Sequence, residues 1–234
     1  MTIQHCKNCG TDGSGNYCSH CGQSYKTSRI SLPVLLHDVF HFFTHLEKGF
    51  GYTLKQLVVA PGTMQRRYLE GYRGRHQKPF SMFFICASIA ALGRYLIFEA
   101  LIKYYHLPDG GDAHFYHQYW VFLFIVLMPF IALMNWLLFY NEKYYYAEML
   151  VLSLYNLSVL LIGVLLITAL HLINPYWNTD YIDLGFALLY NIVTFYRFFS
   201  RSNHWVVIIK TIIATALFFQ LVQVSEDLVK GLVR

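Results

Sequence analysis

Five apolar stretches, each close to the length of a membrane-crossing helix, occupy most of the last two-thirds of this 234-residue chain. A helix needs about 20 apolar residues to cross the hydrocarbon core of a bilayer. The composition agrees, because 13% of the residues are charged, against about 25% in an average soluble chain. The sequence therefore predicts an all-α polytopic membrane bundle. The stretches are Phe80–Ile102, Tyr119–Tyr140, Glu148–Leu172, Ile182–Phe199 and His204–Val224.

The fourth stretch is the shortest and contains Asn191, so the prediction is four or five transmembrane helices. Charge in the connecting segments predicts their orientation. Residues 107–112 and 174–178 are poor in Lys and Arg, whereas residues 141–143 and 197–201 carry cations. Lys and Arg are enriched in short cytoplasmic loops, so we expect a cytoplasmic N-terminus. Five helices would place the C-terminus outside, and four would place both termini in the cytoplasm.

Four of the five cysteines form two Cys-x-x-Cys turns near the N-terminus, and glycine follows each turn. A tetrahedral zinc ion needs four ligands, and each turn supplies two thiolates from one tight loop. We therefore predict a zinc-ribbon knuckle module that binds one structural Zn²⁺ in a closed shell, which leaves no site for a catalytic water. Two redox-active pairs are the alternative, but no βαβ pattern accompanies them. The predicted ligands are Cys6, Cys9, Cys18 and Cys21.

Composition divides the chain into three parts. Residues 1–23 form the cytosolic zinc-knuckle module, and residues 80–234 form the transmembrane helical domain. Residues 24–79 between them supply a linker, interfacial helices and a basic segment. Within this middle part, residues 34–59 are too polar to cross a membrane and too apolar to stay in water. Such a segment is typical of an amphipathic helical region that lies in the membrane interface.

Glycine and proline divide this interfacial region. We expect Gly49 and Gly51 to break it into two helices, and Pro61 with Gly62 to end the second helix. Three histidines in its first part fall four residues apart and so share one helix face. An i, i+4 histidine pair can chelate a metal ion, which would make a second metal site. The interpretation that we favour is a polar face of imidazoles. The residues are His37, His41 and His45.

A cluster of cations, which we call the basic collar, precedes the first apolar stretch. Arginine side chains match phosphate oxygens in bidentate geometry, so the predicted ligands are phospholipid headgroups. Nucleic acid is a weaker alternative, because the collar is short and adjacent to the bilayer. A topology signal without a specific ligand is a further alternative. The collar residues are Arg66, Arg67, Arg73, Arg75 and Lys78.

Charged and amide side chains interrupt the apolar stretches. A charge deep in the membrane costs about 2.5–3.5 kcal/mol unless it is paired or reaches the interface. Arg94 and Glu99 are therefore either functional intramembrane residues or residues that reach the outer interface together with Lys103. Other polar residues in such helices more often mediate helix packing than line a transport path. We assign this packing role to Asn135, Glu148, Asn156 and Asn191.

Residues 44–79 carry distinctive motifs, among them Thr44-His45-Leu46-Glu47-Lys48-Gly49-Phe50, Pro61-Gly62 and Tyr68-Leu69-Glu70-Gly71-Tyr72-Arg73. The pattern closely resembles an uncharacterised family of bacterial inner-membrane proteins, common in Bacteroidetes and known as a domain of unknown function. The resemblance implies a multi-pass protein of the bacterial inner membrane whose paired knuckles end in Cys-Gly-Gln, here residues 21–23. The chain departs from the pattern at Tyr72, where many members have lysine. The resemblance implies no activity.

No set of catalytic acid, base and nucleophile is discernible in the sequence. The leading hypothesis is therefore a non-enzymatic, membrane-anchored adaptor or assembly factor whose zinc module binds a cytosolic protein. An oligomeric transporter or pore that uses the polar intramembrane residues is the alternative from another class. An intramembrane lipid-modifying enzyme ranks last. The expected partners are the phospholipid membrane, a cytosolic protein and further copies of the chain.

Overall fold

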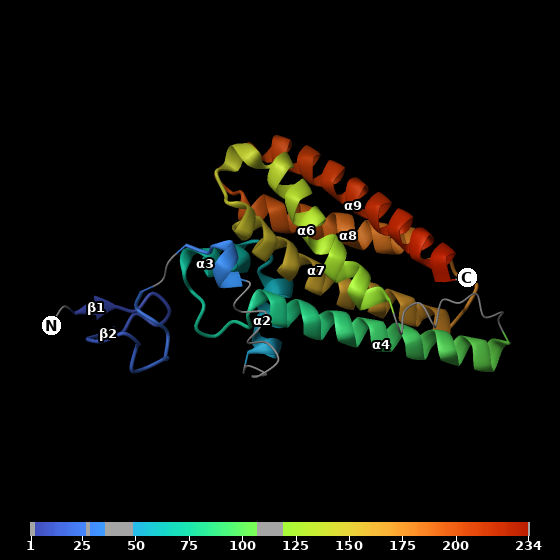
Figure 1. Ribbon diagram of the computed structural model, residues 1–234, viewed down its shortest axis with the longest axis horizontal. Helices are drawn as coiled ribbons and strands as arrows, with labels where there is room; N and C mark the ends of the chain where they lie inside the picture. The colour runs from blue at the N-terminus through green and yellow to red at the C-terminus, as the bar shows by residue number, and fades with distance from the viewer. Residues whose placement is uncertain (1–2, 27–28, 36–48, 107–118, 234) are drawn as a thin grey trace.

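The computed structural model describes residues 3–26, 29–35, 49–106 and 119–233. The N-terminal module contains a short antiparallel hairpin, and the other elements of the described chain are helices (Figure 1). The elements are β1 (Gln4–His5), β2 (Asp12–Gly13), α2 (Phe50–Val59), α3 (Thr63–Glu70), α4 (Pro79–Tyr105), α6 (Trp120–Leu138), η1 (Tyr140–Glu142), α7 (Tyr146–Thr168), η2 (Ala169–Leu172), α8 (Asp180–Phe198) and α9 (His204–Val233).

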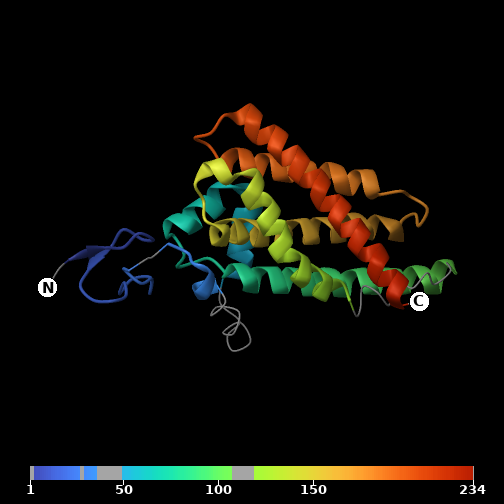
Figure 2. The ribbon, with the colours of Figure 1, turned by 45° about the horizontal axis from the view of Figure 1, so that its top comes forward.

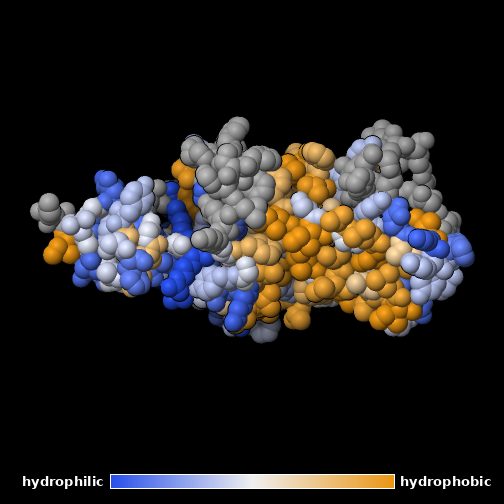
Figure 3. Space-filling view, turned by 90° about the horizontal axis from the view of Figure 1, so that it is seen from below, coloured by the Kyte–Doolittle hydropathy of each residue, from blue (hydrophilic) through white to orange (hydrophobic). Residues whose placement is uncertain are grey.

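The long helices α4, α6, α7, α8 and α9 lie side by side and alternate in direction (Figures 1 and 2). The N-terminal module, α2 and α3 lie at one end of this bundle, which we call the module end, and the C-terminus lies at the other, the distal end. On the face that Figure 3 shows, the surface between the two ends is a broad apolar band, flanked by hydrophilic surface at the module and at the distal end. This pattern is compatible with a bundle whose middle is covered by lipid.

Four helices are long and apolar enough to cross a membrane, namely Pro79–Tyr105, Trp120–Leu138, Tyr146–Leu172 and His204–Val229. They correspond to four of the five stretches that the sequence predicts. The remaining stretch, Ile182–Phe199, forms α8 but is less apolar. Two of its polar residues, Asn191 and Thr194, are buried inside the bundle, at 7% and 0% exposure.

The helix α7 is the centre of the bundle. Residues 147–161 are buried without interruption, and α7 contacts α4, α6 and α8 as well as α2 and α3. A helix that is apolar on all sides must be covered on all sides. One polar group in this buried run contacts the segment just before α4, because the hydroxyl of Tyr155 donates to the carbonyl of Gln77 at 2.5 Å. The centre of the bundle therefore also fixes the segment that precedes α4.

The helices α2 and α3 form a corner that packs against the module end of α7 and α8. The predicted stop is confirmed, since α2 ends at Val59, just before Pro61 and Gly62. The first of the two predicted helices falls largely outside the described residues, and Gly51 does not break the second, because it lies inside α2. Two bonds join this corner to α8, from Tyr190 Oη to the Leu57 carbonyl at 3.2 Å and from Arg197 Nη1 to the Val59 carbonyl at 3.4 Å.

Gly62 is where this corner meets α8 most closely. It has φ +75°, and a Cβ there would clash with the carbonyl oxygen of Thr194 and lie 2.8 Å from the Phe198 amide nitrogen. We expect Gly62→Ala to lower the free energy of unfolding by about 2 kcal/mol, because the left-handed backbone alone costs a side chain about 1–2 kcal/mol.

The matched control is Gly51→Ala in α2, where a Cβ has nothing within 4 Å. This change is expected to leave stability unchanged or to raise it by up to about 1 kcal/mol. Denaturant titration of both variants in detergent measures the difference. Equal stability of the two variants would contradict the close approach of Gly62 to α8.

Candidate metal centre and the docking of its module

The four predicted cysteines converge on one point. Their Sγ atoms lie within 4.8 Å of one another, with 3.6 Å between Cys6 and Cys21 and 3.5 Å between Cys9 and Cys18. Four sulfurs around a tetrahedral ion with metal–sulfur bonds of about 2.3 Å lie about 3.8 Å apart. The distances that the structure shows are close to this value, so the four cysteines could hold a metal ion.

The two turns that carry these cysteines have the same construction. In each turn, the amide of the closing glycine donates to the carbonyl of the first cysteine at 2.9 Å, from Gly10 to Cys6 and from Gly22 to Cys18. Both glycines have positive φ, +78° and +72°, a conformation that side chains with Cβ rarely adopt. Glycine therefore lets each turn close beneath its pair of sulfurs.

Polar groups favour the thiolate, which is the form that binds a metal, at two of the four sulfurs. At Cys6 the bond from the Cys9 amide is outweighed by burial and by the neighbouring sulfurs of Cys21 and Cys9, which raise the pKa of this thiol to about 11. The Thr11 hydroxyl, 3.3 Å from Cys9 Sγ, and then the Thr11 amide lower the pKa of the Cys9 thiol to about 6. The backbone amide of Cys21 is the main cause that lowers the pKa of the Cys18 thiol. Outer contacts of this kind orient ligands in metal sites, and the residue types fit a four-thiolate centre.

Within the described part of the chain, no second group of His, Cys, Asp and Glu converges in this way. The predicted face of His37, His41 and His45 lies outside the described residues. His5, which precedes the first turn, contacts Asp12 Oδ1 at 2.7 Å through its Nδ1, so this nitrogen is directed at the hairpin partner.

The module is docked on the collar through Gln23, the residue after the second knuckle. Gln23 is 7% exposed, and its Nε2 donates to the carbonyl of Gly71 at 2.6 Å. Its Oε1 accepts from the amides of Arg73 at 3.2 Å and Gly74 at 2.8 Å. A Cβ on Gly74 would lie 2.9 Å from the Asn8 Nδ2 of the module. We call this arrangement the Gln23 clamp.

A second connection joins the segment after the module to the bundle. Arg29 forms a bidentate pair with Glu148, with 2.5 Å from Nε to Oε1 and 2.8 Å from Nη2 to Oε2. Its Nη2 also donates to the carbonyl of Lys143 at 3.1 Å, and its guanidinium lies 3.8 Å from the ring centroid of Tyr145. Glu148 is 4% exposed. A buried carboxylate needs such a partner, so the pair fastens the linker to the start of α7.

The sequence did not indicate either connection. Arg29 lies in a polar segment that reads as a linker, and its partner is 119 residues away. Glu148 has a packing role, as predicted, but it packs against the linker and also accepts the Tyr145 amide at 2.9 Å, capping α7. The predicted packing of amides is confirmed, since Asn135 donates to Ser153 at 3.1 Å and Asn156 donates to Asn191.

The collar cations separate into two groups. Arg66 donates to the Ser200 hydroxyl, and Arg73 Nε donates to the carbonyl of Tyr68 at 3.0 Å. These two side chains therefore contribute to the corner itself. The remaining cations are exposed Arg67 and Arg75 and half-buried Lys78.

A cavity of ≈ 190 Å³ lies beside the exposed Arg67, between the module, α2, α3 and the collar. His76 is on its lining, with ring centroids 5.2 Å from Tyr52 and 6.3 Å from Tyr68. Burial, and then the charge of Arg67, lower the pKa of His76. Both causes favour the neutral imidazole, and no sequence pattern pointed to this residue.

Arg94 and Glu99 have different neighbours. The Arg94 guanidinium lies 5.5 Å from the ring of Trp120, the first residue of α6, whose Nε1 donates to Glu226 at 3.3 Å. The exposed Glu99 accepts from the hydroxyl of Tyr95 at 3.4 Å. Arg94 therefore lies near the distal end of the bundle, beside the first turn of α6.

Part of this docking region matches a known family. Residues 47–91 match the family described as "Protein of unknown function (DUF3667)". The match covers α2, α3, the collar and the first half of α4, which is the part that contacts both the module and the bundle. It overlaps the motifs of the resemblance noted in the sequence. Neither the curated proteins nor the solved structures contain a match to the chain.

Proposed function

We propose that the protein is a membrane-anchored adaptor, in which a zinc-stabilised module is fixed at the cytoplasmic end of the bundle and binds a cytosolic protein. The observation that carries this proposal is the docking of the module through the Gln23 clamp and the Arg29–Glu148 pair. A module held in this way presents its free surface at a constant position above the membrane. Such preorganisation lowers the entropy cost of binding a partner.

Zinc is the metal that the donor set favours. Four thiolates in a tetrahedral arrangement are typical of structural zinc sites, which are closed to water. A module of about 20 residues buries too little apolar surface to fold without such a centre. The ion would therefore stabilise the module. By fixing Cys21 it would also fix the backbone of Gly22 and Gln23, and so the position of the Gln23 side chain in the clamp.

The distribution of cations supports a cytoplasmic module end. Arg29, Arg66, Lys143 and Arg201 line one cavity of ≈ 510 Å³ there, in addition to the rest of the collar. Short cytoplasmic segments are enriched in such residues. The alternating directions of the helices support α8 as a fifth crossing, with the C-terminus on the outer side, and the family resemblance supports a bacterial inner membrane.

The module offers apolar side chains for a partner. Ile3 and Tyr17 are 77% and 69% exposed, and tyrosine and large apolar residues are common anchors at protein interfaces. We expect Ile3→Ser combined with Tyr17→Ser to remove a specific set of cross-linked cytosolic proteins while the metal content stays unchanged. Quantitative mass spectrometry after cross-linking in the native host measures this loss.

The matched control changes Tyr176 and Trp177, which are 80% and 48% exposed at the distal end, to serine. This variant should retain the same cytosolic proteins, because its changes lie on the other side of the membrane. The adaptor proposal is wrong if both double variants recover the same proteins in the same amounts as the unchanged chain.

Lipid contact by the collar has its own test. We expect Arg67→Gln combined with Arg75→Gln to reduce retention of phosphatidylglycerol in native mass spectrometry, since each cation near an anionic surface contributes about 1 kcal/mol. The effect should decrease with added salt. Lys103→Gln, an exposed cation of α4 outside the collar, is the control. Equal lipid loss in the control variant would show that the collar has no special role.

A further inference from the structure

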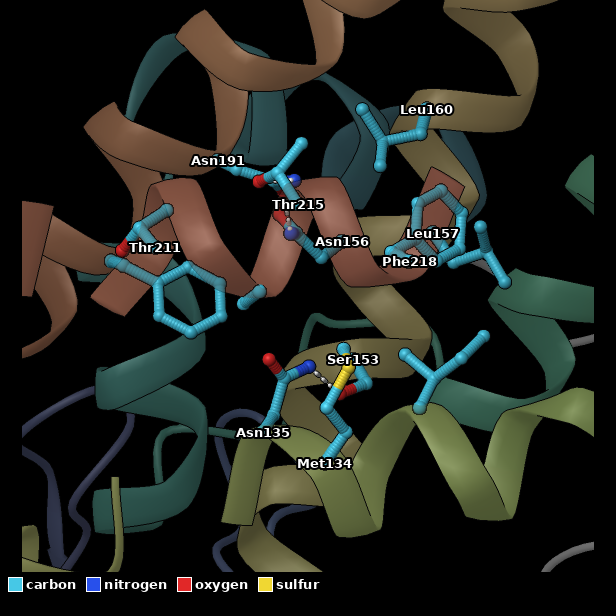
Figure 4. Close-up of a pocket in the computed structure, with 13 residues that line it drawn as sticks. Met134, Asn135, Ser153, Asn156, Leu157, Leu160, Asn191, Thr211, Thr215 and Phe218 are labelled. Atoms are coloured by element: carbon cyan, nitrogen blue, oxygen red, sulfur yellow. Dashed lines mark hydrogen bonds between the residues drawn. The ribbon is translucent and has the colours of Figure 1, made fainter. Parts of the chain in front are cut away.

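A small cavity with a mostly apolar wall and several polar groups lies between α6, α7, α8 and α9. Its volume is ≈ 30 Å³. Apolar side chains such as Leu160 and Phe218 contribute to its wall, and amide and hydroxyl groups from all four helices face it (Figure 4). The polar residues of the lining are Asn135, Ser153, Asn156, Asn191, Thr211 and Thr215.

These polar residues form two separate hydrogen-bonded groups. In the first, Asn156 of α7 donates to Asn191 of α8, whose Nδ2 donates to Thr215 of α9 at 3.0 Å. In the second, Asn135 of α6 donates to the hydroxyl of Ser153 on α7 at 3.1 Å. Figure 4 shows the two groups on opposite sides of the cavity. No direct bond between the groups is found among the described residues.

One strong acceptor in the cavity is unpaired. Asn156 is 7% exposed, and its Oδ1 has no hydrogen-bond partner within the described part of the protein. A buried amide oxygen without a partner is costly in a low-dielectric interior. Across the cavity, the Ser153 hydroxyl accepts from Asn135 and still has a proton to donate. A small ligand that accepts from Ser153 and donates to Asn156 would satisfy both groups.

The size and charge of the cavity select this ligand. A water molecule needs a cavity volume of about 10–15 Å³ and two to four polar partners. The cavity of ≈ 30 Å³ can therefore hold one or two water molecules. No carboxylate is among the lining residues that the structure describes, and a cation among neutral groups alone would pay a large desolvation cost. We infer that the cavity is a binding site for one or two water molecules that bridge Ser153 and Asn156.

The bridge would connect polar groups of four helices. Lipid gives helices no hydrophobic reason to associate, so packing and interhelical hydrogen bonds hold them together. The water site would join Asn135 of α6 to Asn191 of α8 and Thr215 of α9. It would also explain how α8, the least apolar long helix, is held in the bundle.

Radiolytic footprinting in lipid nanodiscs tests this site, because hydroxyl radicals form from water next to the oxidised side chain. Met134 lines the cavity, whereas Met128 on the same helix is 3% exposed and packs in the apolar core. We expect Met134 to be oxidised several-fold faster than Met128. Met134 is half-buried and Met128 is buried, so the decisive comparison is with Ser153→Ala combined with Asn156→Leu, in which the rate at Met134 should fall several-fold.

Three outcomes overturn the inference. Equal oxidation of Met134 and Met128 in the unchanged protein would mean a dry cavity, and this comparison needs no variant to fold. Undiminished oxidation of Met134 in the double variant, with normal metal content as the folding control, would mean that the water lies elsewhere. A loss of oxidation when sodium replaces choline in the buffer would mean that a cation occupies the site.

Discussion

In a protein that carries Cys9→Ser and Cys21→Ser, we expect the metal content to fall from about one zinc per chain to near zero. Each substitution removes one sulfur from one turn, and the two remaining sulfurs cannot complete a tetrahedral shell. Structural zinc contributes on the order of 10 kcal/mol to such modules, so the module should unfold. Elemental analysis measures the metal, and limited proteolysis of the N-terminal segment measures the unfolding.

The bundle should stay inserted in this variant, because lipid and helix packing stabilise its long helices independently of the metal. The control is Cys86→Ser, which changes a buried cysteine of α4 that is remote from the module. This variant should keep its zinc. Metal that remains in the double variant at the level of the unchanged protein would contradict the assignment of the four ligands.

Loss of Arg29 should produce the next largest effect. Breaking a buried ion pair costs about 3–5 kcal/mol, because the remaining charge is left without a partner. The Arg29 side chain is 50% exposed and that of Glu148 is 5% exposed. Solvent screening at Arg29 therefore places the expected loss of stability at the lower end of this range. We expect Arg29→Ala to lower the free energy of unfolding by about 3 kcal/mol, as measured by denaturant titration in detergent.

The chain offers a matched surface pair as control. Arg66 and Glu70 lie 3.9 Å apart, with side chains 31% and 55% exposed, and an exposed pair contributes about 0–1 kcal/mol. Glu70→Gln should therefore change stability little. A combined Arg29→Ala and Glu148→Leu variant should recover part of the loss, because no buried charge remains. Equal stability of Arg29→Ala and the unchanged chain would mean that the linker is not fastened to α7.

The features that the sequence predicted depend on local spacing. Each Cys-x-x-Cys turn closes over a few residues, so the convergence of Cys6, Cys9, Cys18 and Cys21 follows from two short repeats. The long apolar helices follow from length and composition, which are also local properties. The end of a helix just before Pro61 and Gly62 reflects backbone preferences of single residues.

The features that the sequence could not predict are contacts between distant segments. Gln23 meets Gly71 across 48 positions, and Arg29 meets Glu148 across 119. No periodic sequence pattern indicates either contact, because each one is made by a single side chain. Hydropathy leaves the place of α8 undecided between four and five crossings for a related reason, since it counts Asn191 as a cost whether or not this residue finds a partner inside the bundle.

Hydrogen exchange in the collar tests most directly whether the metal site holds the module on the membrane domain. The amide of Gly74 donates to Gln23 Oε1, and that of Arg73 donates both to Gln23 Oε1 at 3.2 Å and to the Gly71 carbonyl at 3.1 Å. The amides of Tyr72 and His76 donate within the corner, to the Arg67 and Arg73 carbonyls. We predict that a chelator, or Gln23→Ala, accelerates exchange at Gly74 several-fold and at Arg73 less, because Arg73 keeps its bond to Gly71, and leaves Tyr72 and His76 unchanged. The same exchange rates with and without metal at all four amides would contradict metal-dependent docking.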